Sequence, residues 1–217
     1  GYWIFGDNKF RSHGDEGLGN VDLRTSIVKS SNTYYYALAN DMGVDAIHDF
    51  MAPFGFGQIT GIDLHGEQSG ILPSQAWKRA AYKRADQQRW YAGETISLGI
   101  GQGYNSFTML QLASATATLA NRGVQYPPHL MRAIRESRNS TAQTMSSVTP
   151  RDLNLNQKNV DHIIEAMIGV TQEGTSRLSF ANAPYLSAGK TGTAQALTIG
   201  QNEKYDAKKL AEYERDH

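Results

Sequence analysis

Helix-type and strand-type patterns follow one another along this chain in an order that restricts the folds open to it. Apolar residues recur at helical spacing from Val21 to Ile168, whereas the one long strand pattern, Tyr185–Leu197, lies near the end. Shorter strand patterns occupy Ile62–Leu64 and Ile71–Leu72, and we find no internal repeat. Because the helices come first and do not alternate with strands, this order predicts an α+β or mixed layered fold.

The clearest predicted helix follows Thr108. Thr108 and Gln111 have the spacing of a capping box, and Gly123 supplies a C-terminal stop. We expect one apolar stripe of this helix to face the core. Its members are Met109, Leu112, Ala113, Thr116, Leu119 and Ala120.

Caps and breakers predict the remaining helices. They are a helix capped by Asp22 that ends at Ser30–Asn32, a second over Thr33–Met42, a third capped by Asp45 that ends at Pro53, a basic helix from Ser74 to Ala85, and one that carries Val160, Ile163, Ile164, Met167 and Ile168. Residues 1–20 are rich in Gly, Asp and Asn and show no period, which predicts a loop.

Composition excludes several classes of protein. The chain has 21 basic and 21 acidic residues, so it lacks the positive charge of a nucleic-acid-binding protein. It has no cysteine, which excludes disulfides, thiolate metal sites and a cysteine nucleophile. Its most apolar stretch, Thr108–Ala120, is interrupted by polar residues and is too short to span a membrane. The start at Gly1 and the charged end, Lys204–His217, indicate an interior piece of a longer protein.

Three short motifs carry the chemistry. Ser30-Ser31-Asn32 lies at a helix break, Lys190-Thr191-Gly192-Thr193 lies in the late strand pattern, and Gly99–Gly103 lies between them. Each motif alone is weak, because the first is also typical of a capping turn and the second of an edge strand. The glycine segment lacks the lysine of a phosphate-binding loop, which favours tight packing and helix entry instead. The combination resembles the Ser-Asp-Asn and Lys-Thr-Gly elements of acyl-serine enzymes, with Ser31 at the middle position of the first.

On these motifs the chain resembles the transpeptidase domain of class B penicillin-binding proteins, of the penicillin-binding protein 2 type that acts in cell elongation. The resemblance covers nearly the whole chain and implies that residues 1–217 are part of one such domain. It implies a penicillin-recognising serine-enzyme fold of the α+β class, with helices on both sides of a mainly antiparallel sheet, incomplete at both ends. The markers are Asn32–Tyr36, Asp41–Gly43, Phe54–Gly57, Thr60–Leu64, Gly99–Gly103 and Gly189–Gln195.

The resemblance also implies roles for six residues. Ser30 is expected to relay a proton between the nucleophile, its lysine and the leaving amine, while Asn32 holds that lysine and the substrate amide. Lys190 is expected to attract the substrate carboxylate, which the hydroxyl groups of Thr191 and Thr193 bind. The backbone N–H of Thr193 is expected to form half of an oxyanion hole. Gly192 leaves the strand edge open to the substrate.

The function implied is a peptidoglycan D,D-transpeptidase that cross-links stem peptides through an acyl-serine intermediate. β-Lactams are its expected inhibitors, and no cofactor is expected. Expected partners are a membrane glycosyltransferase and other elongation-complex proteins, without nucleic acid, at the periplasmic face of the bacterial inner membrane. Two alternatives stay open: a D,D-carboxypeptidase or β-lactamase-like hydrolase, and a non-catalytic domain that senses penicillin or muropeptides.

The nucleophile departs from the family pattern. In the family, Ser-x-x-Lys lies tens of residues before Ser-x-Asn, so we expect it to precede Gly1. Ser26-Ile27-Val28-Lys29 is a formal match and places Ser26 and Lys29 on one helix face. It adjoins Ser30 directly, however, and Asp22 as the helix start leaves Ser26 a full turn inside, so we expect Ser26 not to be the nucleophile.

The sequence also contains a partial zinc pattern and a run of basic residues. Some relatives bind zinc through Asp, His and Cys, and Asp7 and His13 resemble two of those ligands. Ser31 stands where the cysteine is expected, so the tetrahedral site is incomplete and we predict no metal. The basic run Lys78–Arg89 is typical of a solvated helix face, with contact to a membrane surface or a partner as the alternative.

Overall fold

The computed structural model describes residues 1–12, 17–137, 139–144 and 149–194. Its helices are α1 (Leu23–Val28), α2 (Asn32–Met42), α3 (Val44–Met51), the 3₁₀ turn η1 (Ala52–Phe54), α4 (Gln75–Ala81), α5 (Ala85–Gln88), α6 (Ala92–Leu98), α7 (Met109–Ala120), α8 (Gln157–Gln172) and α9 (Arg177–Phe180). Its strands are β1 (Tyr2–Phe5), β2 (Asn8–Arg11), β3 (Val124–Gln125), β4 (Ala133–Ile134), β5 (Gln143–Thr144) and β6 (Arg151–Asp152). No described helix has the length and apolar character needed to cross a membrane.

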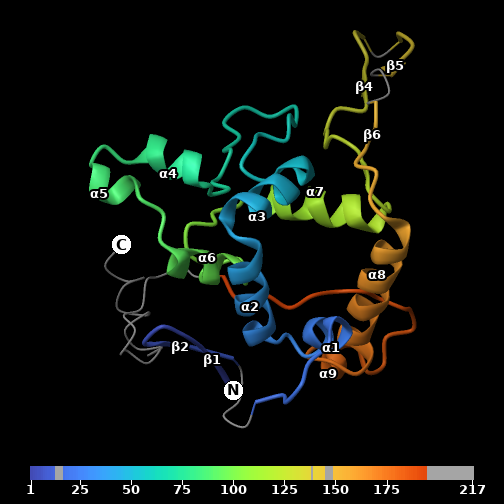
Figure 1. Ribbon diagram of the computed structural model, residues 1–217. Coiled ribbons are helices and arrows are strands. Elements are labelled where there is room, and N and C mark those ends of the chain that lie inside the picture. The colour runs from blue at the N-terminus through green and yellow to red at the C-terminus, as the bar shows by residue number, and fades with distance from the viewer. Residues whose placement is uncertain (13–16, 138, 145–148, 195–217) are drawn as a thin grey trace, which may run out of the picture.

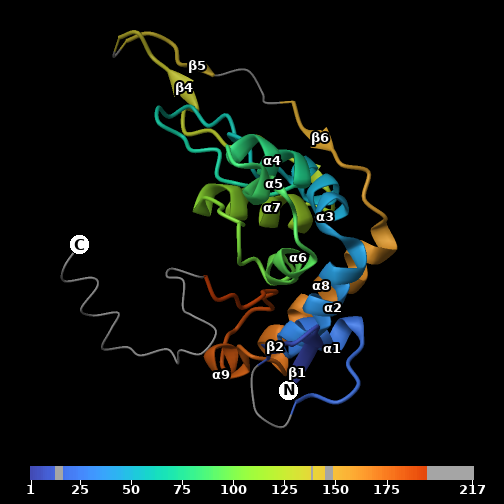
Figure 2. The same ribbon diagram turned by 60° about the vertical axis from the view of Figure 1, so that its left-hand side comes forward.

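The helices are arranged around α2, which lies in the middle of the molecule (Figure 1). Helix α1 packs on α8, and α2 packs on α6. The core cluster between α1 and α8 consists of Ile27, Ala166 and Val170, with Tyr35 and Met167 packed against it. Burial of these apolar side chains fixes α1 and the turn after it against α8. A long arm that carries β4 and β5 extends away from the helices (Figure 2).

The described strands form three separate antiparallel pairs, β1–β2, β3–β6 and β4–β5. The central sheet with helices on both sides is therefore not present among the described residues. The prediction of a loop over residues 1–20 is wrong for 2–11, because β1 and β2 form a hairpin in which Trp3 pairs with Phe10. On this hairpin Trp3 stacks on Phe5 and makes a tilted contact with Phe10. These aromatic contacts stabilise the hairpin, and the Gly- and Asp-rich composition gives no sign of them.

The predicted strand at Tyr185–Leu197 is also wrong over its described residues, 185–194, which belong to no strand. No neighbouring strand pairs with this segment among the residues described, and residues 195–197 lie outside them. Ile62–Leu64 likewise forms no strand, whereas Ile71 forms one isolated bridge with Ser106.

Most predicted helix starts are confirmed. The carboxylate of Asp22 accepts the Thr25 N–H at 2.7 Å, and Thr108 and Gln111 form the expected capping box of α7. The start of α3 differs, because Gly43 is its N-cap and Asp45 lies in its first turn. The basic helix from Ser74 ends at Ala81, since Tyr82 adopts extended dihedral angles.

The apolar stripe expected on α7 does not face the core. Met109 is 76% exposed and Leu112 is 40% exposed, whereas the buried positions are Gln111, Ala115 and Thr118. The Gln111 side-chain amide donates to the carbonyl groups of Gln58 and Ser69 at 2.6 and 2.7 Å. Hydrogen bonds to loop carbonyls therefore decide which face turns inward, and a hydrophobicity pattern does not detect them.

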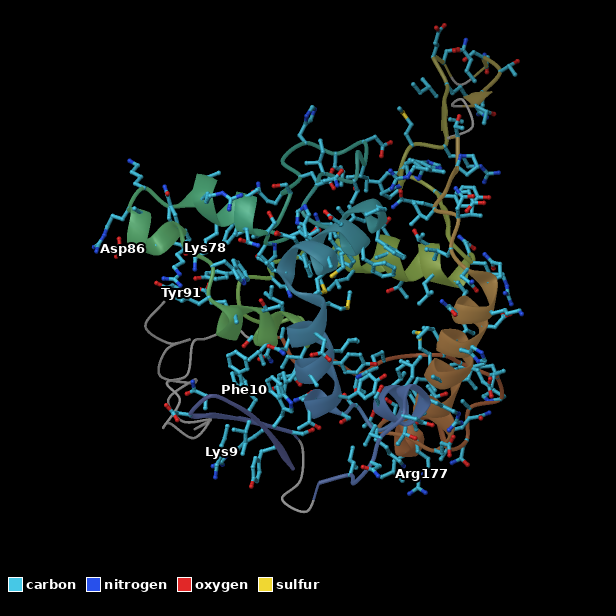
Figure 3. The ribbon with its side chains drawn as sticks, viewed as in Figure 1. Lys9, Phe10, Lys78, Asp86, Tyr91 and Arg177 are labelled. Atoms are coloured by element: carbon cyan, nitrogen blue, oxygen red, sulfur yellow. The ribbon has the colours of Figure 1, made fainter. Side chains whose placement is uncertain are left out.

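Lys78 is likewise not on a solvated face. Its side chain is buried and forms an ion pair with Glu94. The ammonium group lies 5.4 Å from the ring centroids of Trp90, Tyr91 and Tyr104. Figure 3 labels Lys78 and Tyr91 near one another, between α4 and α6. The remaining basic side chains of this run, those of Arg79, Lys83, Arg84 and Arg89, are exposed as predicted.

Candidate active site

Ser30 occupies a strained backbone position at the end of α1. Its φ is +55°, in the left-handed region that favours glycine. Its N–H donates to the Ile27 carbonyl, and the N–H of Ser31 donates to the Ser26 carbonyl at 2.9 Å. These two bonds form a Schellman motif, so the C-terminal geometry of α1 fixes the position of the Ser30 side chain.

Lys190 meets Ser30 across 160 residues of sequence. Its Nζ donates to the Ser30 Oγ at 2.7 Å and to the Thr191 carbonyl at 2.7 Å. Among the residues described, Lys190 forms no ion pair. Desolvation by the surrounding protein atoms lowers the pKa of Lys190 below its ordinary value, because no carboxylate offsets the loss of water.

One cavity of about 550 Å³ brings together every predicted site residue. The residues share this cavity although they come from α1, α2 and the segment after α9: Ser30, Asn32, Lys190, Thr191, Gly192 and Thr193. Asn32 is the first residue of α2, and its N–H donates to the Ser12 hydroxyl at 3.2 Å. Apolar side chains also line the cavity, among them Ile27, Ile163 and Met167. The cavity therefore combines a cation and several hydroxyl groups with an apolar surface.

The segment that carries Lys190 is held by α8 rather than by a sheet. The Gly189 N–H donates to the Met167 carbonyl at 3.1 Å, and the Thr171 hydroxyl donates to the Ser187 carbonyl at 2.7 Å. These bonds place residues 190–193 along the cavity. A Cβ atom built on Gly192 meets no atom within 4 Å, so the space beside this residue is open.

Gln102 is a site residue that the sequence analysis did not identify. Its side-chain amide donates to the Thr193 carbonyl at 3.1 Å. Gly101 and Gly103, with φ of +77° and +72°, form the turn that aims Gln102 at the cavity. Gly99 serves the tight packing expected of it, because a Cβ there would lie 2.7 Å from that of Ala39. A polar residue between two glycines was the available signal.

Thr175 is a second contact that the sequence analysis missed. It lies in the turn between α8 and α9, and its Oγ1 is 3.1 Å from the Thr191 Oγ1. Its segment carries no recognisable motif, so only the folded chain brings these two hydroxyl groups together.

Ser26 and Lys29 do not form a nucleophile and base pair. The Ser26 side chain is 0% exposed, and its Oγ donates to the Leu23 carbonyl at 2.7 Å. The Lys29 Nζ instead donates to the Glu173 carbonyl at 3.1 Å on the surface. A buried hydroxyl group without a base is a weak nucleophile.

The structure describes only one residue of the partial zinc pattern. Asp7 lies exposed in the turn between β1 and β2, and His13 lies outside the described residues. No group of three or more His, Asp or Glu side chains in the described part of the chain is arranged to hold a metal ion.

Comparison with known proteins identifies the family. The model of the penicillin binding protein transpeptidase domain matches residues 1–213, so the chain belongs to this family. Peptidoglycan D,D-transpeptidase MrdA of Acinetobacter baumannii is 41% identical over 97% of this chain, and the protein of that name from Escherichia coli K12 is 35% identical over 100% of it. These matches confirm the resemblance to penicillin-binding protein 2.

Solved structures confirm the α+β transpeptidase fold. PBP2 of Pseudomonas aeruginosa, solved in complex with WCK 5153, is 40% identical with a TM-score of 0.78, over 90% of this chain and 42% of that one. PBP2 of Helicobacter pylori gives a TM-score of 0.76 at 28% identity, over 90% of this chain and 35% of that one. The chain spans about a third of the curated relatives, covering 30% of the A. baumannii protein and 34% of the E. coli protein.

Proposed function

We propose that the protein to which this chain belongs is a peptidoglycan D,D-transpeptidase that acts in cell elongation and shape. It cross-links stem peptides through an acyl-serine intermediate and is a target of β-lactams. Residues 1–213 match the transpeptidase family, and we assign residues 1–217 to one domain of that kind. The observation that carries this proposal is the 2.7 Å contact between Lys190 Nζ and Ser30 Oγ.

Ser30 and Asn32 are proposed as the catalytic residues beside the nucleophile. Because Ser30 Oγ accepts its hydrogen bond from Lys190, its own proton is free to be donated to a leaving amine. Asn32 follows within two residues and faces the same cavity. Its amide has both a donor and an acceptor side, which suits simultaneous contact with a lysine and a substrate amide.

Lys190 and the residues after it are proposed to bind the acyl donor. The ammonium group of Lys190 has no carboxylate partner among the described residues, so it is available to attract a ligand carboxylate. The hydroxyl groups of Thr191 and Thr193 are proposed to bind that carboxylate, and the open space at Gly192 admits the ligand backbone. The Thr193 N–H is proposed as half of the oxyanion hole.

We propose that another segment of the protein supplies the nucleophilic serine. Ser26 is buried, and Ser30 is engaged by Lys190 in a relay position. A serine nucleophile needs a base within hydrogen-bond reach, which Ser26 lacks in the described structure. For Ser30, the resemblance to the family assigns the relay role rather than that of the nucleophile.

Partners and location are proposed from the named relatives. One neighbour is the complex of H. pylori PBP2 with MreC, and another is a peptidoglycan synthase complex that coordinates polymerization with crosslinking. We therefore propose that this protein works with a membrane glycosyltransferase and other elongation-complex proteins at the periplasmic face of the inner membrane.

The test is acylation of the full-length protein by a labelled penicillin, followed by product analysis with stem-peptide substrates. We expect a stoichiometric adduct, cross-linked dimers as the main product, and loss of most acylation in Lys190→Ala. Lys158→Ala, which removes an exposed lysine from α8, is the matched control. Free D-Ala without dimers would indicate a carboxypeptidase, and the absence of any adduct or product would contradict an enzymatic role.

A further inference from the structure

The turn after α8 contacts both halves of the candidate active site. It consists of Glu173, Gly174 and Thr175, which we call the 173–175 turn. On one side it holds the end of α1: Glu173 forms an ion pair with Arg24, and its carbonyl accepts from Lys29 Nζ at 3.1 Å. On the other side, Thr175 reaches Thr191. The turn therefore couples the helix end that carries Ser30 to the segment that carries Lys190.

Gly174 allows the backbones to approach closely. A Cβ atom at this position would collide with the Val28 carbonyl and would lie 2.8 Å from the Cα of Val170. Because both neighbours are backbone atoms of packed helices, neither can move aside cheaply. The N–H of the next residue, Thr175, donates to the same Val28 carbonyl at 3.3 Å. This bond fixes the backbone of Thr175 beside Val28, which precedes Ser30 by two residues in the sequence.

The Thr175 hydroxyl group is directed at Thr191, with 3.1 Å between the two Oγ1 atoms. A hydroxyl group has one proton to donate and two lone pairs. When Thr175 donates to Thr191, the Thr191 proton is free for a ligand. When Thr191 donates to Thr175, that proton is already used. A carboxylate beside Lys190 accepts hydrogen bonds only, so its arrival selects the first arrangement.

We infer that Thr175 is a positioning residue for the ligand carboxylate, which acts by orienting the hydroxyl group of Thr191. This inference rests on the proposed function, because it extends the carboxylate site assigned above to Lys190, Thr191 and Thr193. Thr175 itself lies outside the residues that line the cavity, and its side chain is exposed. Its effect on a ligand therefore passes through Thr191.

The test compares benzylpenicillin with its methyl ester, which lacks the free carboxylate, on the full-length protein. Thr175→Val removes the hydroxyl group at nearly constant shape, and Thr175→Ser keeps it. Intact-mass time courses give an apparent dissociation constant and an acylation rate for each pair. We expect Thr175→Val to raise the dissociation constant for the acid about threefold to tenfold, the usual value of one hydrogen bond. We expect no change for the ester, and wild-type values for Thr175→Ser.

Two further variants separate orientation from structure. In a Thr191→Val background, Thr175→Val should have no additional effect, because the hydroxyl group that it orients is gone. Thr116→Val removes a hydroxyl group that bonds within α7, and it should leave the dissociation constant and the acylation rate unchanged for both ligands. An equal loss with acid and ester would indicate a purely structural role and overturn the inference. So would unchanged acid kinetics in Thr175→Val while the wild-type protein is acylated. Failure of the wild-type protein to be acylated at all would instead overturn the proposed function, and this inference with it.

Discussion

Lys190 Nζ lies 2.7 Å from Ser30 Oγ, and Ser30 holds that position at a φ of +55°. Left-handed backbone geometry favours glycine, yet glycine has no side-chain oxygen to accept the bond from Lys190. The position is therefore a compromise between local backbone energy and the chemistry of the cavity. Strain of this kind is concentrated at functional sites in many proteins.

Ser30→Gly should separate these two demands. We expect the free energy of unfolding to rise by roughly 0.5–1 kcal/mol, because glycine adopts the left-handed conformation without strain. Penicillin acylation of the full-length protein should fall strongly, because the hydroxyl group is lost. Urea denaturation and acylation rates measure the two effects. Ser30→Ala is the control, since it loses the hydroxyl group and keeps the strain, and it should lower acylation without the gain in stability.

Lys190 should make stability depend on pH in the alkaline range. Desolvation lowers its pKa in the folded protein, so between that lowered pKa and 10.5 the unfolded chain binds more protons than the folded one. The contribution of Lys190 to the free energy of unfolding therefore rises with pH across that window. Below the window Lys190 is protonated in both states, and the folded protein bears the full cost of desolvating its charge. We expect the free energy of unfolding of the wild-type protein to increase relative to that of Lys190→Met as pH rises, as measured by urea denaturation. Parallel pH profiles for the two proteins would contradict this expectation, and Lys158→Met controls for the removal of a surface lysine.

We expect the side-chain amide of Gln102 to be needed for fast acylation. It donates to the Thr193 carbonyl at 3.1 Å and so restrains the peptide proposed to form part of the oxyanion hole. Gln102→Ala should slow acylation about tenfold, corresponding to roughly 1.4 kcal/mol for one hydrogen bond. Gln102→Glu should slow it further, because a carboxylate then faces the carbonyl oxygen. Gln157→Glu, far from the cavity on α8, is the matched control. Equal rates for Gln102→Ala and the wild-type protein would remove Gln102 from the site.

Stability measurements should show which face of α7 is buried. Gln111 is 1% exposed and donates to two loop carbonyls, so Gln111→Ala leaves buried acceptors unpaired and should cost about 3 kcal/mol. Leu112 is 40% exposed, so Leu112→Ala should cost about 1 kcal/mol or less. The stripe pattern alone predicts the opposite order, with about 2–5 kcal/mol for Leu112→Ala. Thermal unfolding of the two variants of this chain decides between the two orders.

Motifs and caps were readable from the sequence because they depend on neighbours in the chain. Asp22 and Thr108 begin their helices through bonds that span three residues, and such spacing is visible without a fold. The segments Ser30–Asn32 and Lys190–Thr193 were found in the same way, and both line the cavity. The hairpin at Tyr2–Arg11 was missed because its stability comes from aromatic pairs, whereas its turn residues resemble a loop.

The sequence by itself determined the family, the helix starts and the residue types of the site, because local spacing and side-chain chemistry specify them. Only the tertiary structure decided which side chains meet. Gln102 contacts Thr193 across 91 residues, and Thr175, in the turn after α8, contacts Thr191. The burial of Lys78 and Gln111 was decided at the same level, because their partners lie in distant loops and helices. Such contacts depend on how whole elements pack, and a polar residue in a sequence carries no mark of the partner that will bury it.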